Sequence, residues 1–233
     1  MTFIAPHYIK AKKRSFFSFF KQDRFLIKTP WWIKKLYPGC LWDMGKQEKV
    51  IYLTFDDGPH PSITPWLLQL LDKYNAKATF FCIGDNVVKY PDVYQQILAM
   101  GHAVGNHTQH HLNGWKTKDI DYLQDIQVAG MHIASPLFRP PYGRISRSQI
   151  KKLSATTLDN KAPTIVMWNI LAGDWVQELS PEKCYQRLHK KIKGGEIIVF
   201  HDSEKAWERM SFALPKLLAA NSKQGFSFQA IKK

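Results

Sequence analysis

The chain has 233 residues, of which 45% are apolar and 13% aromatic, and this composition excludes a disordered protein and allows one substantial core. Its three cysteines, Cys40, Cys82 and Cys184, are widely spaced, which argues against a disulfide framework and favours a reducing compartment. No apolar run approaches the ~20 residues that span a bilayer, and the first residues lack the order of a secretory signal. We therefore expect a cytoplasmic or peripherally membrane-associated protein.

The formal charge of +14 is concentrated at the start of the chain. Residues 1–49 hold eleven Lys or Arg against three acidic residues, a net +8, and eleven aromatic residues lie among them. Two interpretations stay open: a basic arm whose aromatic side chains pack on the domain, or a contact with an anionic membrane surface or polymer. Nucleic acid is not expected, because no recognisable binding module accompanies the charge.

From residue 50 onward, short apolar runs alternate with segments of helical spacing. The alternation predicts one α/β domain over 50–233 with a parallel sheet, open or closed into a barrel. Strands are predicted at 50–55, 78–83, 103–106, 137–139, 164–169, 196–200 and 226–231. Helices are predicted at 63–74, 184–192 and 213–220.

Polar motifs follow five of these predicted strands. They read, in chain order, TFDDGP, GNHTQHH, RPPYG, NILAGDW and FHD. In parallel sheets, catalytic and binding groups gather at the carboxyl ends of the strands. The five motifs are therefore expected to meet at one end of the sheet.

An aspartate and two histidines in the first two motifs suggest a metal site. The spacing of His107 and His111 places both rings on one side of a helical turn, although His110 could compete with His111. With one carboxylate, two imidazoles make a three-ligand site with an open fourth position, which is typical of catalytic zinc. Such an ion lowers the pKa of bound water and polarises a carbonyl oxygen.

The five ordered motifs resemble those of the polysaccharide deacetylases with a NodB-homology domain, carbohydrate esterase family four, over residues 50–231. The resemblance implies an irregular, TIM-like (β/α) barrel with about seven parallel strands alternating with helices. It implies hydrolysis of the N-acetyl group of an N-acetylhexosamine in a glycan, with release of acetate.

The resemblance also assigns the metal and the base. Asp57, His107 and His111 match the ligands of Zn²⁺ or another divalent transition metal. Asp56 matches the general base for the attacking water, and Arg139 the residue that positions Asp56 by a charged hydrogen bond.

The remaining motifs match groups around the departing amine and the acetyl group. His201 matches the general acid and Asp174 the residue that orients its ring. The backbone N–H of Tyr142 matches an oxyanion donor. Trp175 and Val199 match the wall of a small pocket for the acetyl methyl.

The chain departs from the family pattern in two places. The fourth motif of the family often reads Asp-x-x-Asp-Trp. Here residues 171–175 read LAGDW, so Leu171 replaces the first aspartate, which leaves the local loop geometry in doubt. At position 199, Val replaces a Leu that is common in the family.

Other functions remain as alternatives. An O-deacetylase, or a non-catalytic protein that binds a glycan or a membrane surface, fits the same scaffold. A glycosidase fits poorly, because it needs two carboxylates on opposite sides of the scissile bond, ~5 Å or more apart, whereas adjacent residues of a strand point to opposite faces. An Mg²⁺-dependent phosphoryl transferase leaves the histidines without a role. Chitin oligomers, peptidoglycan, lipid-linked sugars and acetylated xylan remain possible substrates. The sequence further predicts that a chain beginning near Lys46 folds and retains its activity.

Overall fold

Eight short strands form one parallel sheet in the computed structural model, which describes residues 26–46 and 48–232. Seven of them follow one path in the order β5-β4-β3-β2-β1-β7-β6, and β8 pairs with β1. The strands are β1 (Val50–Asp56), β2 (Thr79–Cys82), β3 (Ala103–Asn106), β4 (Leu137–Phe138), β5 (Thr164–Ile165), β6 (Ile170–Leu171), β7 (Ile197–His201) and β8 (Ser227–Phe228). The predicted irregular (β/α) barrel is confirmed.

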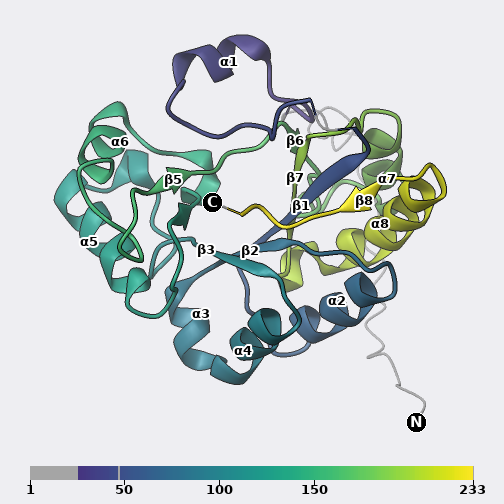
Figure 1. The fold of residues 1–233 in the computed structure, drawn as a ribbon, viewed down its shortest axis with the longest axis horizontal. Helices are drawn as coiled ribbons and strands as arrows, with labels where there is room; N and C mark the ends of the chain where they lie inside the picture. The colour runs from purple at the N-terminus through teal and green to yellow at the C-terminus, as the bar shows by residue number, and fades with distance from the viewer. Residues whose placement is uncertain (1–25, 47, 233) are drawn as a thin grey trace.

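Helices surround the curled sheet, as Figure 1 shows. They are α1 (Trp31–Leu36), α2 (Ile63–Asp72), α3 (Gly84–Lys89), α4 (Pro91–Ala99), α5 (Asp119–Gly130), α6 (Arg147–Leu153), α7 (Pro181–His189) and α8 (Glu204–Lys223). Helix α8 begins well before the predicted 213–220 and continues through Pro215. Short 3₁₀ turns lie at Gly114–Lys116 and Pro141–Gly143.

The core explains why the central strands are apolar throughout. Leu53 and Phe55 of β1 are fully buried, and Phe55 stacks against Phe80 of β2 and Phe200 of β7. Helix α2 contributes fully or almost fully buried leucines at the helical spacing, and these belong to the same hydrophobic cluster. Because neighbouring strands and the covering helices both bury these side chains, the central ladder is a rigid support for the loops that follow it.

The predicted strand at 164–169 is shorter in the structure, and a further strand begins directly after it. Its first two residues form β5 and pair with β4, whereas β6 begins at Ile170 and pairs with β7. Residues 166–169 therefore connect the two ends of the sheet path. This short link is where the barrel curls back on itself and where its strand pairing is interrupted.

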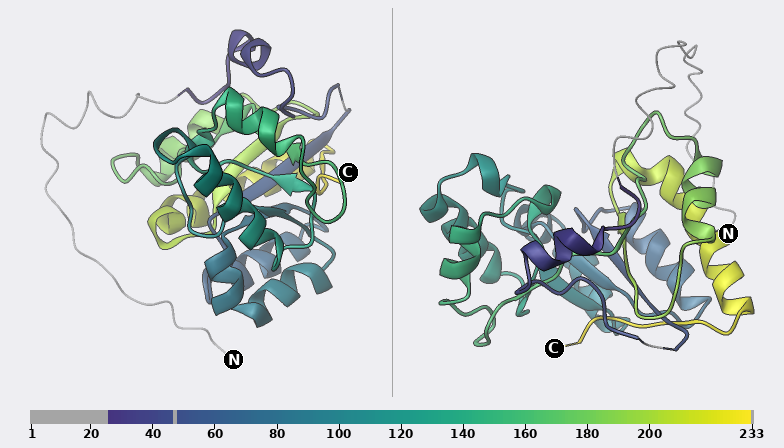
Figure 2. Two further views of the ribbon diagram at one scale, coloured as in Figure 1. Left: turned by 90° about the vertical axis from the view of Figure 1, so that its left-hand side faces the viewer. Right: turned by 90° about the horizontal axis from the view of Figure 1, so that it is seen from above.

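The described part of the basic segment, residues 26–46, lies along this link, and we call it the N-terminal wall. The backbone N–H of Leu171 donates to Ile27 at 2.8 Å, and that of Thr29 donates to Asn169 at 2.9 Å. Further along, Leu41 donates to Ile165 at 2.8 Å and accepts from Met167 at 2.7 Å. The wall thus pairs with both sides of the interruption. Figure 2 shows its helix α1, in purple, lying across the top of the fold.

The wall has a buried end and an exposed end. Cys40 and Trp42 join a hydrophobic cluster under α5 and α6, whereas Trp31 and Trp32 are 68% and 51% exposed. The packing interpretation therefore applies to its second half. The aromatic residues expected to pack further upstream, Phe16, Phe17, Phe19 and Phe20, lie outside the described residues. The boundary between 1–49 and 50–233 stays a prediction.

Within the described ranges, no helix combines the length and apolar character needed to cross a membrane.

Candidate active site

A cavity of about 640 Å³ opens at the carboxyl ends of the strands and collects residues from all five motifs. Eight of the ten predicted site residues line it: Asp56, Asp57, His107, His111, Tyr142, Trp175, Val199 and His201. The other two, Arg139 and Asp174, lie behind it and contact Asp56 and His201. The structure thus brings together every residue that the motifs single out. We call this cavity the catalytic pocket.

The adjacent carboxylates Asp56 and Asp57 both face the catalytic pocket. Strand alternation predicts that they point to opposite faces, and this expectation is wrong. Asp56 is the last residue of β1, whereas Asp57 has a φ of 81°, in the left-handed region. That conformation ends the strand and turns the second side chain back beside the first. The alternation argument against paired carboxylates therefore does not hold here.

Asp57, His107 and His111 form a compact group of potential metal ligands. One ligand atom from each lies within 4.8 Å of the others. Asp57 Oδ1 is 3.3 Å from His111 Nε2 and 3.8 Å from His107 Nε2. One carboxylate oxygen and two imidazole nitrogens that converge in this way fit a tetrahedral ion with one position left open.

The tautomer of His107 is fixed by its other ring nitrogen. Nδ1 lies 2.8 Å from the backbone carbonyl oxygen of Arg139, which can only accept, so Nδ1 carries the proton. Nε2 therefore presents its lone pair to Asp57 and His111. A hydrogen bond of this kind commonly orients metal-binding histidines.

The charge states of this group suit a cation. Burial favours a neutral Asp57, but the hydrogen bond from His111 and the nearby His201 and His107 outweigh it and hold its pKa well below the usual value. Burial lowers the pKa of His107 to about 4, against the opposing charge of Asp56. At neutral pH the group therefore offers a carboxylate and a neutral imidazole as ligands.

The backbone around the two histidines is irregular. The spacing argument places them on a helical turn, yet residues 107–113 form no helix. Thr108 and His111 instead adopt left-handed backbone conformations, with φ values of 64° and 56°. The two rings still converge, with centroids 5.1 Å apart. The predicted pairing is present, but a looped backbone produces it.

His110, the competing histidine, takes no part in this group. Its ring Nδ1 forms a short hydrogen bond with Asp125 of α5, and the backbone N–H of His110 donates to the same carboxylate at 3.1 Å. Asp125 also accepts from the backbone N–H of Gln109 at 3.0 Å. The buried Asp125 thus holds the loop between His107 and His111 and keeps His110 away from them.

Arg139 is fully buried, and its guanidinium donates four hydrogen bonds to groups of the barrel. Nη1 donates to Asp56 Oδ1 and Thr54 Oγ1, both at 2.7 Å. Nε and Nη2 donate to the carbonyls of Val166 and Met167 at 3.1 and 3.0 Å. These carbonyls belong to the link between β5 and β6, so Arg139 fills the interruption of the barrel from inside while it holds Asp56.

His201 is held by Asp174 in two ways. Asp174 Oδ1 lies 2.9 Å from His201 Nδ1, and Oδ2 accepts the backbone N–H of His201 at 2.8 Å. Burial favours the neutral ring, but the charge and hydrogen bond of Asp174 outweigh it and raise the pKa of His201 to about 10. Trp175 packs edge-on against the ring, with centroids 5.0 Å apart. His201 is therefore oriented and protonated at neutral pH.

Tyr142 lines the catalytic pocket beside His111, in the 3₁₀ turn after β4. Its backbone is left-handed, with a φ of 60°, and its ring lies 4.6 Å from that of His111. Gly143 follows with a φ of 66°, and a side chain there would collide with Trp168. The turn therefore depends on the glycine of the RPPYG motif.

Several residues of the site escape sequence reasoning. Thr54 and Asp125 act through Arg139 and His110, and only the fold shows these pairings. Trp168, in the link 166–169, and Leu171, at the end of β6, also line the catalytic pocket. Leu171, which replaces the family's first aspartate, adds an apolar surface there.

The fold and site are those of a β/α-barrel hydrolase, and comparison with known proteins identifies the family. The family model described as polysaccharide deacetylase matches residues 43–160. The chain belongs to this family, the NodB-homology deacetylases of carbohydrate esterase family four, and it is an enzyme that deacetylates glycans.

Characterised relatives and a solved structure agree with this assignment. A peptidoglycan-N-acetylglucosamine deacetylase of Bacillus cereus is 35% identical over 196 residues, which cover 82% of this chain and 90% of the relative. A chitooligosaccharide deacetylase of Azorhizobium caulinodans is 33% identical over 67% of this chain and 75% of its own length. The crystal structure of a peptidoglycan N-acetylglucosamine deacetylase in complex with a substituted benzamide superposes with a TM-score of 0.77, at 28% identity, over 87% of this chain and 95% of that one.

Proposed function

We propose that the enzyme hydrolyses the N-acetyl group of N-acetylhexosamine units in a glycan, with a divalent transition metal, zinc as our first assignment. The observation that carries this proposal is the convergence of the Asp57, His107 and His111 ligand atoms beside Asp56 and His201 in one pocket. Asp57, His107 and His111 would hold the ion. When bound, such an ion polarises the amide carbonyl and lowers the pKa of water toward neutrality.

The chain's own residues account for the proton transfers. Asp56 accepts a proton from the attacking water, and its hydrogen bond to Arg139 keeps the carboxylate aimed into the catalytic pocket. As the carbon–oxygen bond forms and the carbon–nitrogen bond breaks, His201 Nε2 donates its proton to the departing amine. The products are acetate and a free amino group. Asp174 stabilises the imidazolium and leaves Nε2 directed away from itself.

Two further groups support binding of the acetamide. The backbone N–H of Tyr142 is proposed as the oxyanion donor, since its turn borders the ligand group. Trp175 and Val199 are proposed to contact the acetyl methyl, because both line the catalytic pocket beside His201. The names of the relatives, peptidoglycan and chitooligosaccharide deacetylases, support an N-acetylglucosamine substrate.

The test compares wild-type enzyme with Asp56→Asn on N-acetylglucosamine oligomers. Acetate and free amine are measured together, and zinc per chain is measured by elemental analysis. Asp56→Asn should bind zinc and lose ~10²–10⁴-fold in kcat, because a positioned base contributes that much. Asp121→Asn, an exposed aspartate of α5, is the matched control and should retain activity.

Three results would contradict the proposal. Full activity in Asp56→Asn removes the general-base role. Activity that survives complete metal removal removes the metal. Acetate release from O-acetylated xylan, without any amine from the N-acetylated oligomers, identifies an O-deacetylase.

A further inference from the structure

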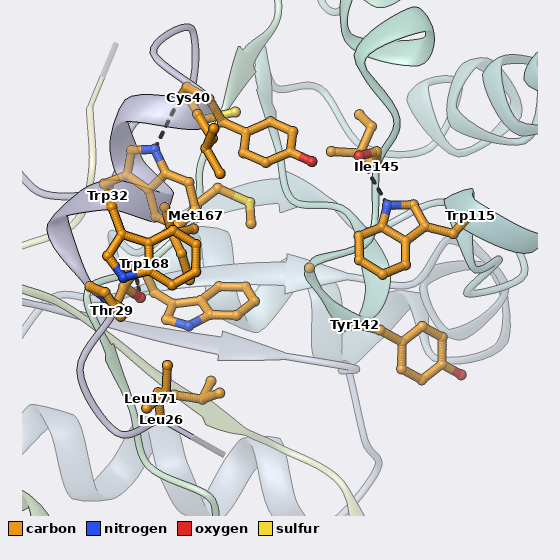
Figure 3. A pocket seen from close by; sticks show the side chains of 16 residues that line it. Leu26, Thr29, Trp32, Cys40, Trp115, Tyr142, Ile145, Met167, Trp168 and Leu171 are labelled. Carbon is orange, nitrogen blue, oxygen red and sulfur yellow. Dashed lines mark hydrogen bonds between the residues drawn. The ribbon is translucent and has the colours of Figure 1, made fainter. Parts of the chain in front are cut away.

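A second cavity, of about 370 Å³, adjoins the catalytic pocket beneath the N-terminal wall. The side chains that line this cavity are mostly apolar, and Figure 3 shows them. Leu26, Trp32 and Leu36 come from the N-terminal wall, and Trp115 comes from the 3₁₀ turn Gly114–Lys116. A volume of this size is in the range of small-molecule sites.

The two cavities adjoin each other and share part of their lining. Trp168 and Leu171 line both, as does the turn of Tyr142 and Gly143 that borders the ligand histidines. A molecule seated with its acetamide in the catalytic pocket can therefore extend into the second cavity. Its occupant is expected to be part of the substrate.

Three polar groups among the side chains that line the second cavity already have backbone partners. The Trp115 indole N–H donates to the carbonyl of Ile145 at 3.2 Å, and the Thr29 hydroxyl donates to that of Trp168 at 2.9 Å. The Trp42 indole N–H donates to the carbonyl of Tyr37 at 3.1 Å. A sugar ring placed here would lose water from its hydroxyl groups and find these donors occupied, which is costly. A hydrocarbon chain carries no such penalty.

The rim of the cavity is also apolar and open to solvent. Leu26, Trp32, Leu36 and Trp115 are between 47% and 61% exposed. Contiguous exposed apolar surface of this kind is typical of binding sites. A hydrocarbon chain lying in the cavity would cover part of it.

We propose that this cavity is an alkyl site, which takes the hydrocarbon chain of an amphiphilic glycan whose N-acetylhexosamine unit lies in the catalytic pocket. The proposal rests on the proposed function, because it assigns the chain to the same substrate. It narrows the substrate class to glycans that carry an apolar aglycone, with lipid-linked sugars as the natural form.

The test uses the full chain and two soluble substrates that differ only in the aglycone. The methyl and octyl glycosides of one N-acetylglucosamine oligomer are compared below the micelle concentration of the octyl form. Each buried methylene can contribute up to about fourfold in affinity. Burial of about two or more methylenes of the octyl chain should therefore raise kcat/KM by about tenfold or more, mainly through KM.

A matched pair of variants locates the effect. Leu36→Asp places a charge at the rim of the alkyl site, and it should bring the octyl-to-methyl ratio of kcat/KM close to one. Ile120→Asp makes the same change at a residue of α5 that is 73% exposed and lines neither cavity. Its ratio should equal that of wild type.

The outcomes separate this inference from the proposed function. A ratio of one in wild type, with both substrates deacetylated, overturns the alkyl site and leaves the deacetylase intact. A ratio above one that Leu36→Asp does not lower also overturns it. If neither glycoside is deacetylated, the proposed function fails, and binding of the octyl against the methyl glycoside by tryptophan fluorescence then decides on the site alone. A gain in kcat/KM from further sugar units, lost in Leu36→Asp, assigns the cavity to a sugar instead.

Discussion

The catalytic pocket and the alkyl site are neighbours built on opposite physical terms. In the first, charged groups are buried and each is held by a partner, as Arg139 holds Asp56 and Asp174 holds His201. In the second, the N-terminal wall exposes large apolar side chains, and the indole N–H of Trp42 donates to a backbone carbonyl. The barrel fixes reacting groups, and the wall supplies surface without reacting groups.

This difference separates what the two regions require of the fold. A buried charge that loses its partner is costly, so the catalytic pocket depends on individual hydrogen bonds. The alkyl site depends on shape and on the closure of the link between β5 and β6, to which the wall is hydrogen-bonded. Substitutions should therefore act on chemistry in the first region and on stability or substrate range in the second.

Removal of the wall should have the largest effect. A chain that begins at Lys46 lacks Trp42 and the backbone bonds to residues 165–171. Loss of one buried tryptophan already costs about 3–5 kcal/mol. We expect the shortened chain to be insoluble, or to unfold at least about 10 °C below a chain that begins at Leu26.

Circular dichroism on heating measures this difference. The chain from Leu26 keeps every contact described above and is the control. If the chains from Leu26 and Lys46 unfold at the same temperature, the N-terminal wall does not stabilise the barrel. It would then be an appendage, as the sequence alone predicts.

Substitutions of the adjacent residues His110 and His111 should have different effects on metal binding. His111→Ala removes one of three converging ligands, and its zinc affinity should fall by more than the ~10–100-fold that loss of an outer partner costs. His110→Ala leaves the ligands in place and should retain zinc after dialysis. Metal content by elemental analysis gives the result, and the reverse pattern would reassign the ligand.

The two ends of the wall should differ in their contribution to stability. Trp42→Ala removes a ring that is 8% exposed and should lower the free energy of unfolding by about 3–5 kcal/mol. Trp31 is 68% exposed and contacts Lys35, so Trp31→Ala should cost less than about 1 kcal/mol. Denaturant titration of both variants measures this, and a large loss in Trp31→Ala would contradict the exposed position of α1.

The sequence predicts well which residues line the catalytic pocket, because each motif lies at or after the end of a strand, and a parallel sheet brings strand ends together. Asp57 and His107 are 50 positions apart in the numbering, yet β1, β2 and β3 are successive neighbours in the sheet. The motif order then supplies His201, whose strand β7 pairs with β1 on its other side.

Features that depend on tertiary pairing are less visible. Residues 164–169 have the composition of a strand, but only the first two pair with β4, and the pairing with β7 begins at Ile170, at the opposite end of the sheet path. Helix α5 carries three acidic residues and a weak apolar stripe, so its spacing gives no clear signal. Asp125 on that helix holds His110, a contact between residues in separate elements.

The closure of the link also sets the order of events during synthesis. Thr29 and its partner Trp168 are separated by 139 residues, so the wall leaves the ribosome long before its partner exists. At ~5–20 residues per second, this interval is roughly 7–28 s. During it, a stretch rich in tryptophan and lysine has no sheet to pair with. Completion of the barrel is therefore a late, non-local step, and the N-terminal wall has no partner until it occurs.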